Sequence, residues 1–183
     1  MFIIKENFYH DPDSMREYAL SLEFSVQGNY PGFRTKPPEE IWWRDYIKQY
    51  LEEEILHKKI IRFPCDYNTS FQYTTKDAVT WVHHDDTTWA GIVYLTPNAP
   101  IESGTAIYQH KESKIFEYKA GDFDYNSTST SMADWDMIAF SGNIYNRLVL
   151  YKGTYYHRSV LPGFGTDART GRLFQTFFFD TEV

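Results

Sequence analysis

From about residue 60 to the end of the chain, apolar and polar residues alternate in short runs with a period of two. This period is typical of half-buried β-strands, and turn-forming residues separate the runs. Seven or eight such strands favour a sandwich or barrel, because each strand must bury its apolar face against another sheet. The candidate strands are Ile60–Phe63, Ser70–Thr75, Val79–His84, Trp89–Thr96, Gly104–His110, Trp135–Phe140, Arg147–Tyr151 and Arg172–Asp180.

The first sixty residues follow a helical pattern instead. Asp11 and Pro12 supply an N-cap and a first-turn proline. An apolar stripe at helical spacing then comprises Met15, Tyr18, Ala19 and Leu22. A longer helix is predicted from about Glu39 to Lys59, with Glu52–Glu54 on its solvated face. Its expected buried face consists of Trp43, Ile47, Tyr50, Leu51 and Ile55.

Composition limits the class of protein. The length of 183 residues predicts one domain, 1–183, with helical support at 1–60 and a β core at 61–183. A net charge of −7 and the lack of a basic run argue against nucleic-acid binding. The sequence contains neither an 18-residue apolar stretch nor a signal-peptide pattern, so we expect no membrane partner. The lone Cys65 excludes an intramolecular disulfide and favours the cytoplasm.

The segment Thr80–Asp86 places a histidine two residues before an aspartate twice over. On a strand, residues i and i+2 share a face, so His83 pairs with Asp85, and His84 pairs with Asp86 on the opposite face. We expect the first pair to face the interior, because its side of the strand carries the larger apolar residues. His84 and Asp86 are then expected at the outer face or in a loop.

A third candidate ligand, His157, follows 74 residues after His83. Two histidines and one carboxylate on one face of a metal form the facial triad of non-haem Fe(II) oxygenases, which leaves positions open for substrate and dioxygen. Arg172 follows His157 by 15 residues and heads an aromatic strand. A buried arginine needs an anion, and its forked guanidinium suits a carboxylate.

In this order and on these strands, the residues resemble the Fe(II)- and 2-oxoglutarate-dependent dioxygenases, particularly the prolyl-4-hydroxylase-like branch, over residues 68–180. The resemblance implies a double-stranded β-helix (jelly-roll, cupin-like) core behind N-terminal helices. It implies Fe(II), 2-oxoglutarate and dioxygen as cofactor and co-substrates of an oxidoreductase, most plausibly a hydroxylase that forms succinate. The implied catalytic metal ligands are His83, Asp85 and His157, and the implied 2-oxoglutarate residues are Arg172, Tyr94 and Thr176.

The sequence also departs from the family pattern. The interval from His157 to Arg172 is longer than usual, which makes Arg169 a rival anchor for 2-oxoglutarate. We prefer Arg172 because it begins a strand, whereas Arg169 lies in the Gly165–Gly171 loop. Phe174 replaces the small hydroxyl residue that often follows the arginine two positions later.

Two other classes of function stay open. A cupin-like metal enzyme that does not use 2-oxoglutarate would not need the buried arginine. A non-catalytic jelly-roll binding module would tolerate loss of the triad. The substrate is left open between a small molecule and a protein side chain, as is the oligomeric state. The loops expected to shape substrate binding are Gly28–Lys36 and Asp122–Met132.

Overall fold

The computed structural model describes residues 2–28, 30–39, 41–64, 67–125, 131–160 and 163–182, without the side chains of Ile41 and Trp42. The expectations for Cys65 and for residues 126–130 of the Asp122–Met132 loop therefore lie outside the described residues. Within these ranges, no helix is both long and apolar enough to cross a membrane.

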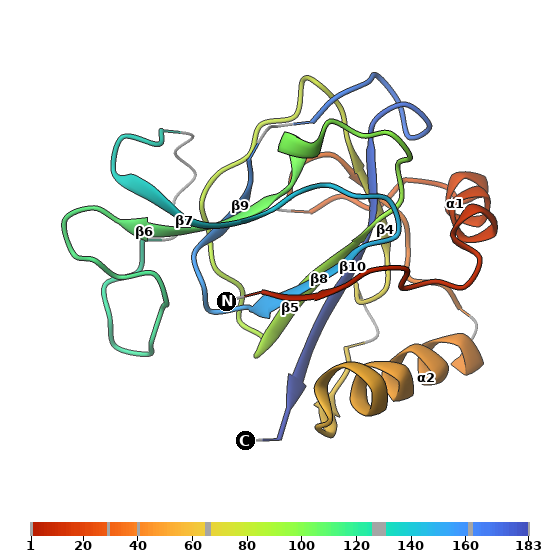
Figure 1. Ribbon diagram of the computed structural model, residues 1–183, viewed down its shortest axis with the longest axis horizontal. Helices are drawn as coiled ribbons and strands as arrows, with labels where there is room; N and C mark the ends of the chain where they lie inside the picture. The colour runs from red at the N-terminus through yellow and green to blue at the C-terminus, as the bar shows by residue number, and fades with distance from the viewer. Residues whose placement is uncertain are drawn as a thin grey trace.

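Two antiparallel β-sheets form the body of the described chain (Figure 1). The larger sheet has the strand order β1 (Ile3–Lys5), β8 (Leu148–Lys152), β5 (Trp89–Tyr94), β10 (Arg172–Thr181), β4 (Phe71–Thr74) and β2 (Phe33–Arg34), with β3 (Ile60–Arg62) also paired to β10. The smaller sheet consists of β7 (Trp135–Ser141), β6 (Thr105–His110) and β9 (His157–Ser159). A short 3₁₀ helix, η2 (Ile101–Ser103), precedes β6. The predicted mainly β class with N-terminal helices is confirmed.

The N-terminal helix begins where the sequence predicts. Helix α1 spans Pro12–Ser21, and the carboxylate of Asp11 accepts a hydrogen bond of 3.0 Å from the backbone N–H of Ser14. This bond satisfies one of the free N–H groups that every helix N-terminus presents.

The second predicted helix is divided. Helix α2 spans Ile41–Tyr50 and continues as a π-helical segment, η1, over Leu51–Leu56, which ends at His57 with a φ of 52°. The prediction of a solvated Glu52 is wrong. Its carboxylate accepts a 2.7 Å hydrogen bond from the backbone N–H of Ile60 and pairs with Lys59 at 3.3 Å. Glu52 thereby links the end of the helix to the start of β3.

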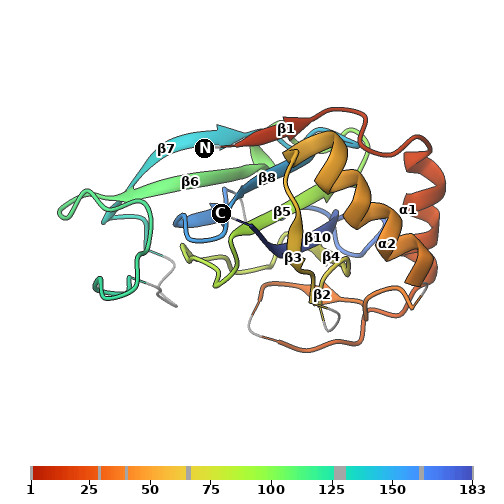
Figure 2. The ribbon, with the colours of Figure 1, turned by 90° about the horizontal axis from the view of Figure 1, so that it is seen from below.

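Strand β10 divides the interior into two regions. Leu173, Phe177 and Phe179 point to one face, where they pack in a core with Ala19 of α1 and Ile47 of α2. Figure 2 shows both helices on the same side of the molecule, away from the β6–β7 hairpin. The alternate residues of β10 point to the other face, and these include Arg172, Phe174, Thr176 and Phe178. Because strand residues alternate, helix packing on one face sets which side chains face the cavity on the other.

Seven of the eight predicted strands are present within one or two residues of their predicted ends. The eighth, Val79–His84, is wrong, because the segment makes only an isolated bridge between His83 and His157. Val79 is 59% exposed, so its apolar side chain does not mark an interior face. The sequence reading also missed three short strands, namely β1, β2 and β9.

Replacing Phe177 with alanine should lower the free energy of unfolding by about 3–5 kcal/mol, because it leaves a cavity beneath the helices. Phe177 is fully buried, whereas Phe123 is 73% exposed and serves as the matched control. Phe123→Ala should change stability by less than about 0.5 kcal/mol. Urea denaturation followed by circular dichroism measures both values. Equal effects of the two substitutions would contradict the assigned core.

Candidate functional site

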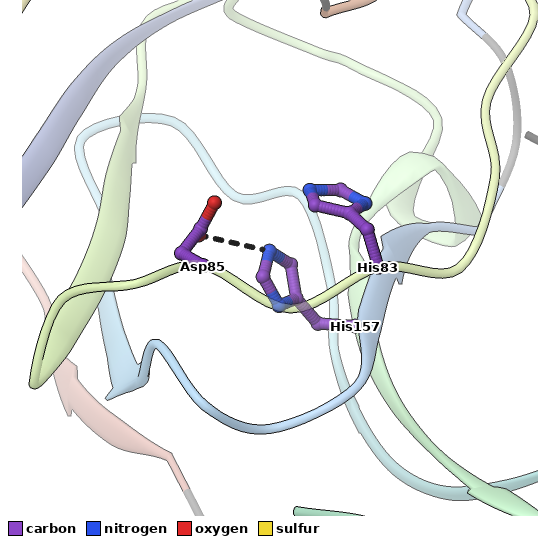
Figure 3. A group of neighbouring side chains, drawn as sticks. All are labelled: His83, Asp85 and His157. Carbon is purple, nitrogen blue, oxygen red and sulfur yellow. Dashed lines mark ion pairs between the residues drawn. The ribbon is translucent and has the colours of Figure 1, made fainter. Parts of the chain in front are cut away.

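The structure brings His83, Asp85 and His157 together, although 74 residues separate the two histidines. One potential ligand atom from each residue lies within 4.8 Å of the other two. Nε2 of His157 lies 3.4 Å from Oδ2 of Asp85 (Figure 3). The His83 and His157 rings have centroids 4.3 Å apart. Among the described residues, this is the one group of at least three His, Cys, Asp or Glu side chains with metal-ligand spacing.

Backbone hydrogen bonds hold the three residues in place. His83 and His157 exchange two bonds, from the His83 N–H to the His157 carbonyl at 3.0 Å and from the His157 N–H to the His83 carbonyl at 2.7 Å. The Asp85 N–H donates to the carbonyl of Gly153 at 2.8 Å. A Cβ atom at position 153 would lie 2.2 Å from the carbonyl oxygen of Thr87, so only glycine allows this approach.

Both histidines have the ring orientation that a metal ligand needs. Nδ1 of His83 lies 3.1 Å from the carbonyl oxygen of Trp81, and Nδ1 of His157 lies 2.8 Å from that of Tyr155. A carbonyl can only accept a hydrogen bond, so each Nδ1 must carry the ring proton. The lone pair of each neutral ring is then on Nε2, free to bind a metal ion.

The carboxylate of Asp85 is incompletely satisfied by the protein. Its Oδ2 atom is buried and accepts no hydrogen bond from the described residues, despite its proximity to His157. Burial raises the pKa of Asp85, and the neighbouring His83 opposes that shift. Burial also lowers the pKa of His157 well below its usual value, reinforced by His83. A buried carboxylate oxygen without a hydrogen-bond partner, beside two imidazole rings, fits a divalent cation.

His84 lies in a loop, which is one of its two expected places, but it is buried and does not lie at the outer face. Its ring is buried and stacks on Tyr118 at a centroid distance of 4.2 Å. Its Nε2 lies 3.2 Å from Oδ1 of Asp124. The local alternation nevertheless separates His84 from the His83–Asp85 pair, and Asp86 is exposed as expected.

A cavity of about 410 Å³ opens beside the three residues, between the two sheets. Arg172 lines it and is only 1% exposed. Its Nε donates to the carbonyl of Ser103 at 2.8 Å, and Nη2 lies 3.4 Å from Oγ1 of Thr105. No acidic residue forms an ion pair with Arg172 in the part of the chain that the structure describes. A buried guanidinium without a carboxylate partner is suited to bind an anion.

The remaining predicted site residues lie at different distances from the cavity. Thr176 lines it and donates to the carbonyl of Ser70 at 3.2 Å. Tyr94 is buried behind the lining, with its hydroxyl 3.0 Å from Oγ1 of Thr105. The rival residue Arg169 lies outside the cavity, where it pairs with Glu17 through two 3.1 Å contacts.

Sequence reasoning missed two residues of the site. Thr105 connects Tyr94 to Arg172, but a threonine at the start of a strand carries no signal of that role. Tyr151 is buried beside His157, with ring centroids 4.6 Å apart. Burial raises the pKa of Tyr151 well above its usual value, so the phenol keeps its proton.

A sequence profile described as a family of unknown function (DUF6445) matches residues 1–179. The chain belongs to the DUF6445 family. No curated protein matches the sequence.

Solved structures show which fold this DUF6445 protein has. It is similar to HygX from Streptomyces hygroscopicus, crystallised with nickel, 2-oxoglutarate and hygromycin B, with a TM-score of 0.63 and 12% identity over 97% of this chain and 82% of HygX. It is also similar to a Pseudomonas putida prolyl-4-hydroxylase, with a TM-score of 0.52 and 13% identity over 100% of this chain and 93% of the hydroxylase. The predicted fold, a jelly-roll core of the 2-oxoglutarate oxygenase type, is confirmed.

Replacing Asp85 with asparagine should stabilise this DUF6445 protein at pH 7 when no metal is present. A raised pKa means that the folded state binds the Asp85 proton more tightly than the unfolded chain does. Stability from protonated Asp85 is therefore present below the unfolded pKa and lost as pH rises through the folded pKa. Asparagine mimics the protonated form, so Asp85→Asn should melt at a higher temperature than the wild type at pH 7.

The same substitution should remove the stabilisation by metal. A ligand at one hundred times its Kd adds about 2.7 kcal/mol to the folded state. Asp85→Asn should lose most of that increment, whereas Asp86→Asn should retain it because Asp86 is exposed. Thermal melts with and without nickel(II) measure both effects. A metal response that depends on Asp86 but not on Asp85 would contradict the assigned group.

Proposed function

We propose that this DUF6445 protein is an Fe(II)- and 2-oxoglutarate-dependent oxygenase that acts as a hydroxylase. The observation that carries the proposal is the pairing of two features in one cavity. His83, Asp85 and His157 present three metal-ligand atoms, and Arg172 presents a buried cation without an acidic partner. A metal enzyme that does not use 2-oxoglutarate would need the first feature but not the second.

The residues present fit the metal and its co-substrate. His83 and His157 would each contribute Nε2, and Asp85 would contribute a carboxylate oxygen. The HygX structure supports a metal and 2-oxoglutarate as ligands of this fold, since HygX was crystallised with nickel and 2-oxoglutarate. When bound, Fe(II) with 2-oxoglutarate and dioxygen would supply the oxidising chemistry, which converts a substrate C–H bond to C–OH and releases succinate and CO₂.

The chain's own residues would position the co-substrate. Arg172 would bind the distal carboxylate, with Thr105 holding the guanidinium and Tyr94 holding Thr105. Nε of Arg172 is already fixed by the carbonyl of Ser103, so the fork is oriented before any ligand arrives. Thr176 lies on the same face of β10 and could assist at this end of the cavity.

The surroundings would protect the reaction from water. The lining includes Ile92, Phe174 and Phe178, which reduce the number of water molecules near the ligand atoms. Tyr151 remains a phenol at neutral pH and can therefore donate a hydrogen bond beside His157. A low-dielectric wall also strengthens the attraction between Arg172 and a carboxylate.

The full-length protein, given Fe(II), 2-oxoglutarate and air, should form succinate even without an added primary substrate, at a slow uncoupled rate. An anaerobic titration with Fe(II) and 2-oxoglutarate should produce the weak visible charge-transfer band of the bound pair. The protein treated with a chelator is the control for both measurements. Absence of the band together with absence of succinate would overturn the proposal.

Replacing Arg172 with leucine should raise the 2-oxoglutarate concentration needed for half-maximal succinate formation by about 30-fold or more. Removing one partner of a buried charge pair costs about 2–5 kcal/mol, and each 1.4 kcal/mol is tenfold in affinity. Metal affinity, measured by thermal shift with nickel(II) alone, should change little. Arg169→Leu is the matched control, because its 65% exposed side chain pairs with Glu17 at the surface. A larger effect of Arg169→Leu would mean that the anchor is misassigned.

A further inference from the structure

A second arginine, Arg34 on β2, lines the same cavity and is only 9% exposed. Its Nε and Nη2 donate to Oε1 of Gln72 at 2.9 and 2.6 Å. The guanidinium carbon lies 3.7 Å from the centroid of the Tyr30 ring. The amide of Gln72 is held in turn by a 2.6 Å bond to the carbonyl of Pro31. Arg34 is therefore fixed by neutral groups on two sides and faces the cavity.

No carboxylate neutralises Arg34 within the described ranges. None of the ion pairs there includes Arg34, and the acidic group that acts on its charge from a distance is Asp85. Burial lowers the pKa of Arg34, but a guanidinium stays protonated in proteins. Burying a cation among neutral dipoles alone destabilises the folded state, and a bound anion would offset this desolvation cost.

The charges of the proposed active site balance one another without Arg34. Asp85 would neutralise one of the two charges of Fe(II), and the 2-oxoglutarate dianion would balance the remaining iron charge and Arg172. The third arginine of the lining, Arg62, is paired with Asp180 at 3.0 Å. Asp86, the other acid of the lining, is exposed and hydrated. One uncompensated positive charge therefore stays buried at Arg34.

Arg34 is also separate from the 2-oxoglutarate end of the cavity. It lies on β2, opposite Gln72 of β4, which in turn lies opposite Phe174 of β10. Two strand spacings, or about 9–10 Å, therefore separate the backbone of Arg34 from the strand of Arg172. The two guanidiniums therefore project into the cavity from strands that are not adjacent.

We infer that Arg34, held by Gln72 and Tyr30, binds a carboxylate group of the primary substrate, which is a small organic acid. The inference rests on the proposed oxygenase function and specifies its substrate class. Gln72 engages one N–H of Nε and one of Nη2, which leaves three of the five guanidinium donors, and no lysine is among the described residues of the lining. This matches a monoanionic carboxylate better than a phosphate dianion. The cavity of about 410 Å³ must also hold 2-oxoglutarate, which favours a small molecule over a polypeptide.

The test uses the full chain loaded with nickel(II) and 2-oxoglutarate, which cannot turn over. Phenylacetate and its uncharged analogue phenylacetamide are titrated in parallel, with inorganic phosphate as a third probe, and binding is followed by ligand-observed NMR. Phenylacetate should bind about tenfold or more tightly than phenylacetamide, as expected for a charge-assisted hydrogen bond. Arg34→Met should abolish that difference, and Arg34→Lys should retain part of it.

Arg62→Met is the matched control, because Arg62 lines the same cavity but is half-exposed and already paired. It should leave the preference for the acid within about twofold of wild type, since exposed pairs contribute little. Equal binding of acid and amide to the wild type, or a preference that persists in Arg34→Met, would overturn the inference. Tighter binding of phosphate than of phenylacetate would overturn the choice of a carboxylate. If Arg34→Met does not fold, the inference is tested by the preference of the wild type for phenylacetate over phenylacetamide and by the reduction of that preference in Arg34→Lys.

Thermal shift with nickel(II) and 2-oxoglutarate separates this inference from the function on which it rests. Arg34→Met should keep the 2-oxoglutarate-dependent shift, whereas Arg172→Leu should lose it. The reverse pattern would mean that Arg34 anchors 2-oxoglutarate and would overturn the inference. If 2-oxoglutarate does not shift the melting temperature of the wild type but phenylacetate still binds through Arg34, the oxygenase proposal is refuted and the anion site at Arg34 is retained.

Discussion

The paired hydrogen bonds between His83 and His157 are the contact on which the site depends. They join a segment that follows β4 to the first residue of β9, in the smaller sheet. Each histidine then sends Nδ1 to the carbonyl two residues before it, so both Nε2 atoms are left free. The same backbone path brings Asp85 to Gly153. Backbone bonds thus bring together two segments that are distant in the sequence, one with His83 and Asp85 and the other with His157.

The alternation of β10 supplies the opposite wall. Its helix-facing residues are held by α1 and α2, and this packing fixes the register of the strand against β4 and β5. Because the period is two, a slip of one residue would exchange Arg172 with Leu173 and place the cation in the apolar core. The energy of helix packing therefore also enforces the position of Arg172 in the cavity wall. The apolar core and the cavity thus lie on opposite faces of β10.

Much of this arrangement was readable from the sequence, because period and spacing are local signals. Most strands, the start of α1 and the grouping of His83, Asp85 and His157 followed from alternation, capping and the order of motifs. The choice of His83 over His84 rested partly on the size of Val79, which is exposed, while His84 is buried among aromatic rings. Whether a side chain is buried depends on contacts between segments that are distant in the sequence. Counting apolar residues along one short segment gives no information on these contacts. Arg34 escaped notice for the same reason, since its partner Gln72 lies on another strand.

Charge compensation explains why these arginines are tolerated at all. Arg16, a further buried arginine, meets carbonyl oxygens of Leu95 and Arg169 and links α1 to the loops around β10. Arg172 and Arg34 also donate to neutral partners, but they differ from Arg16 because both line the cavity. A cation used only for packing could be replaced by an apolar residue at little cost. Two such cations beside one cluster of metal-ligand atoms are the observation from which we infer two anionic ligands, 2-oxoglutarate at Arg172 and a substrate carboxylate at Arg34.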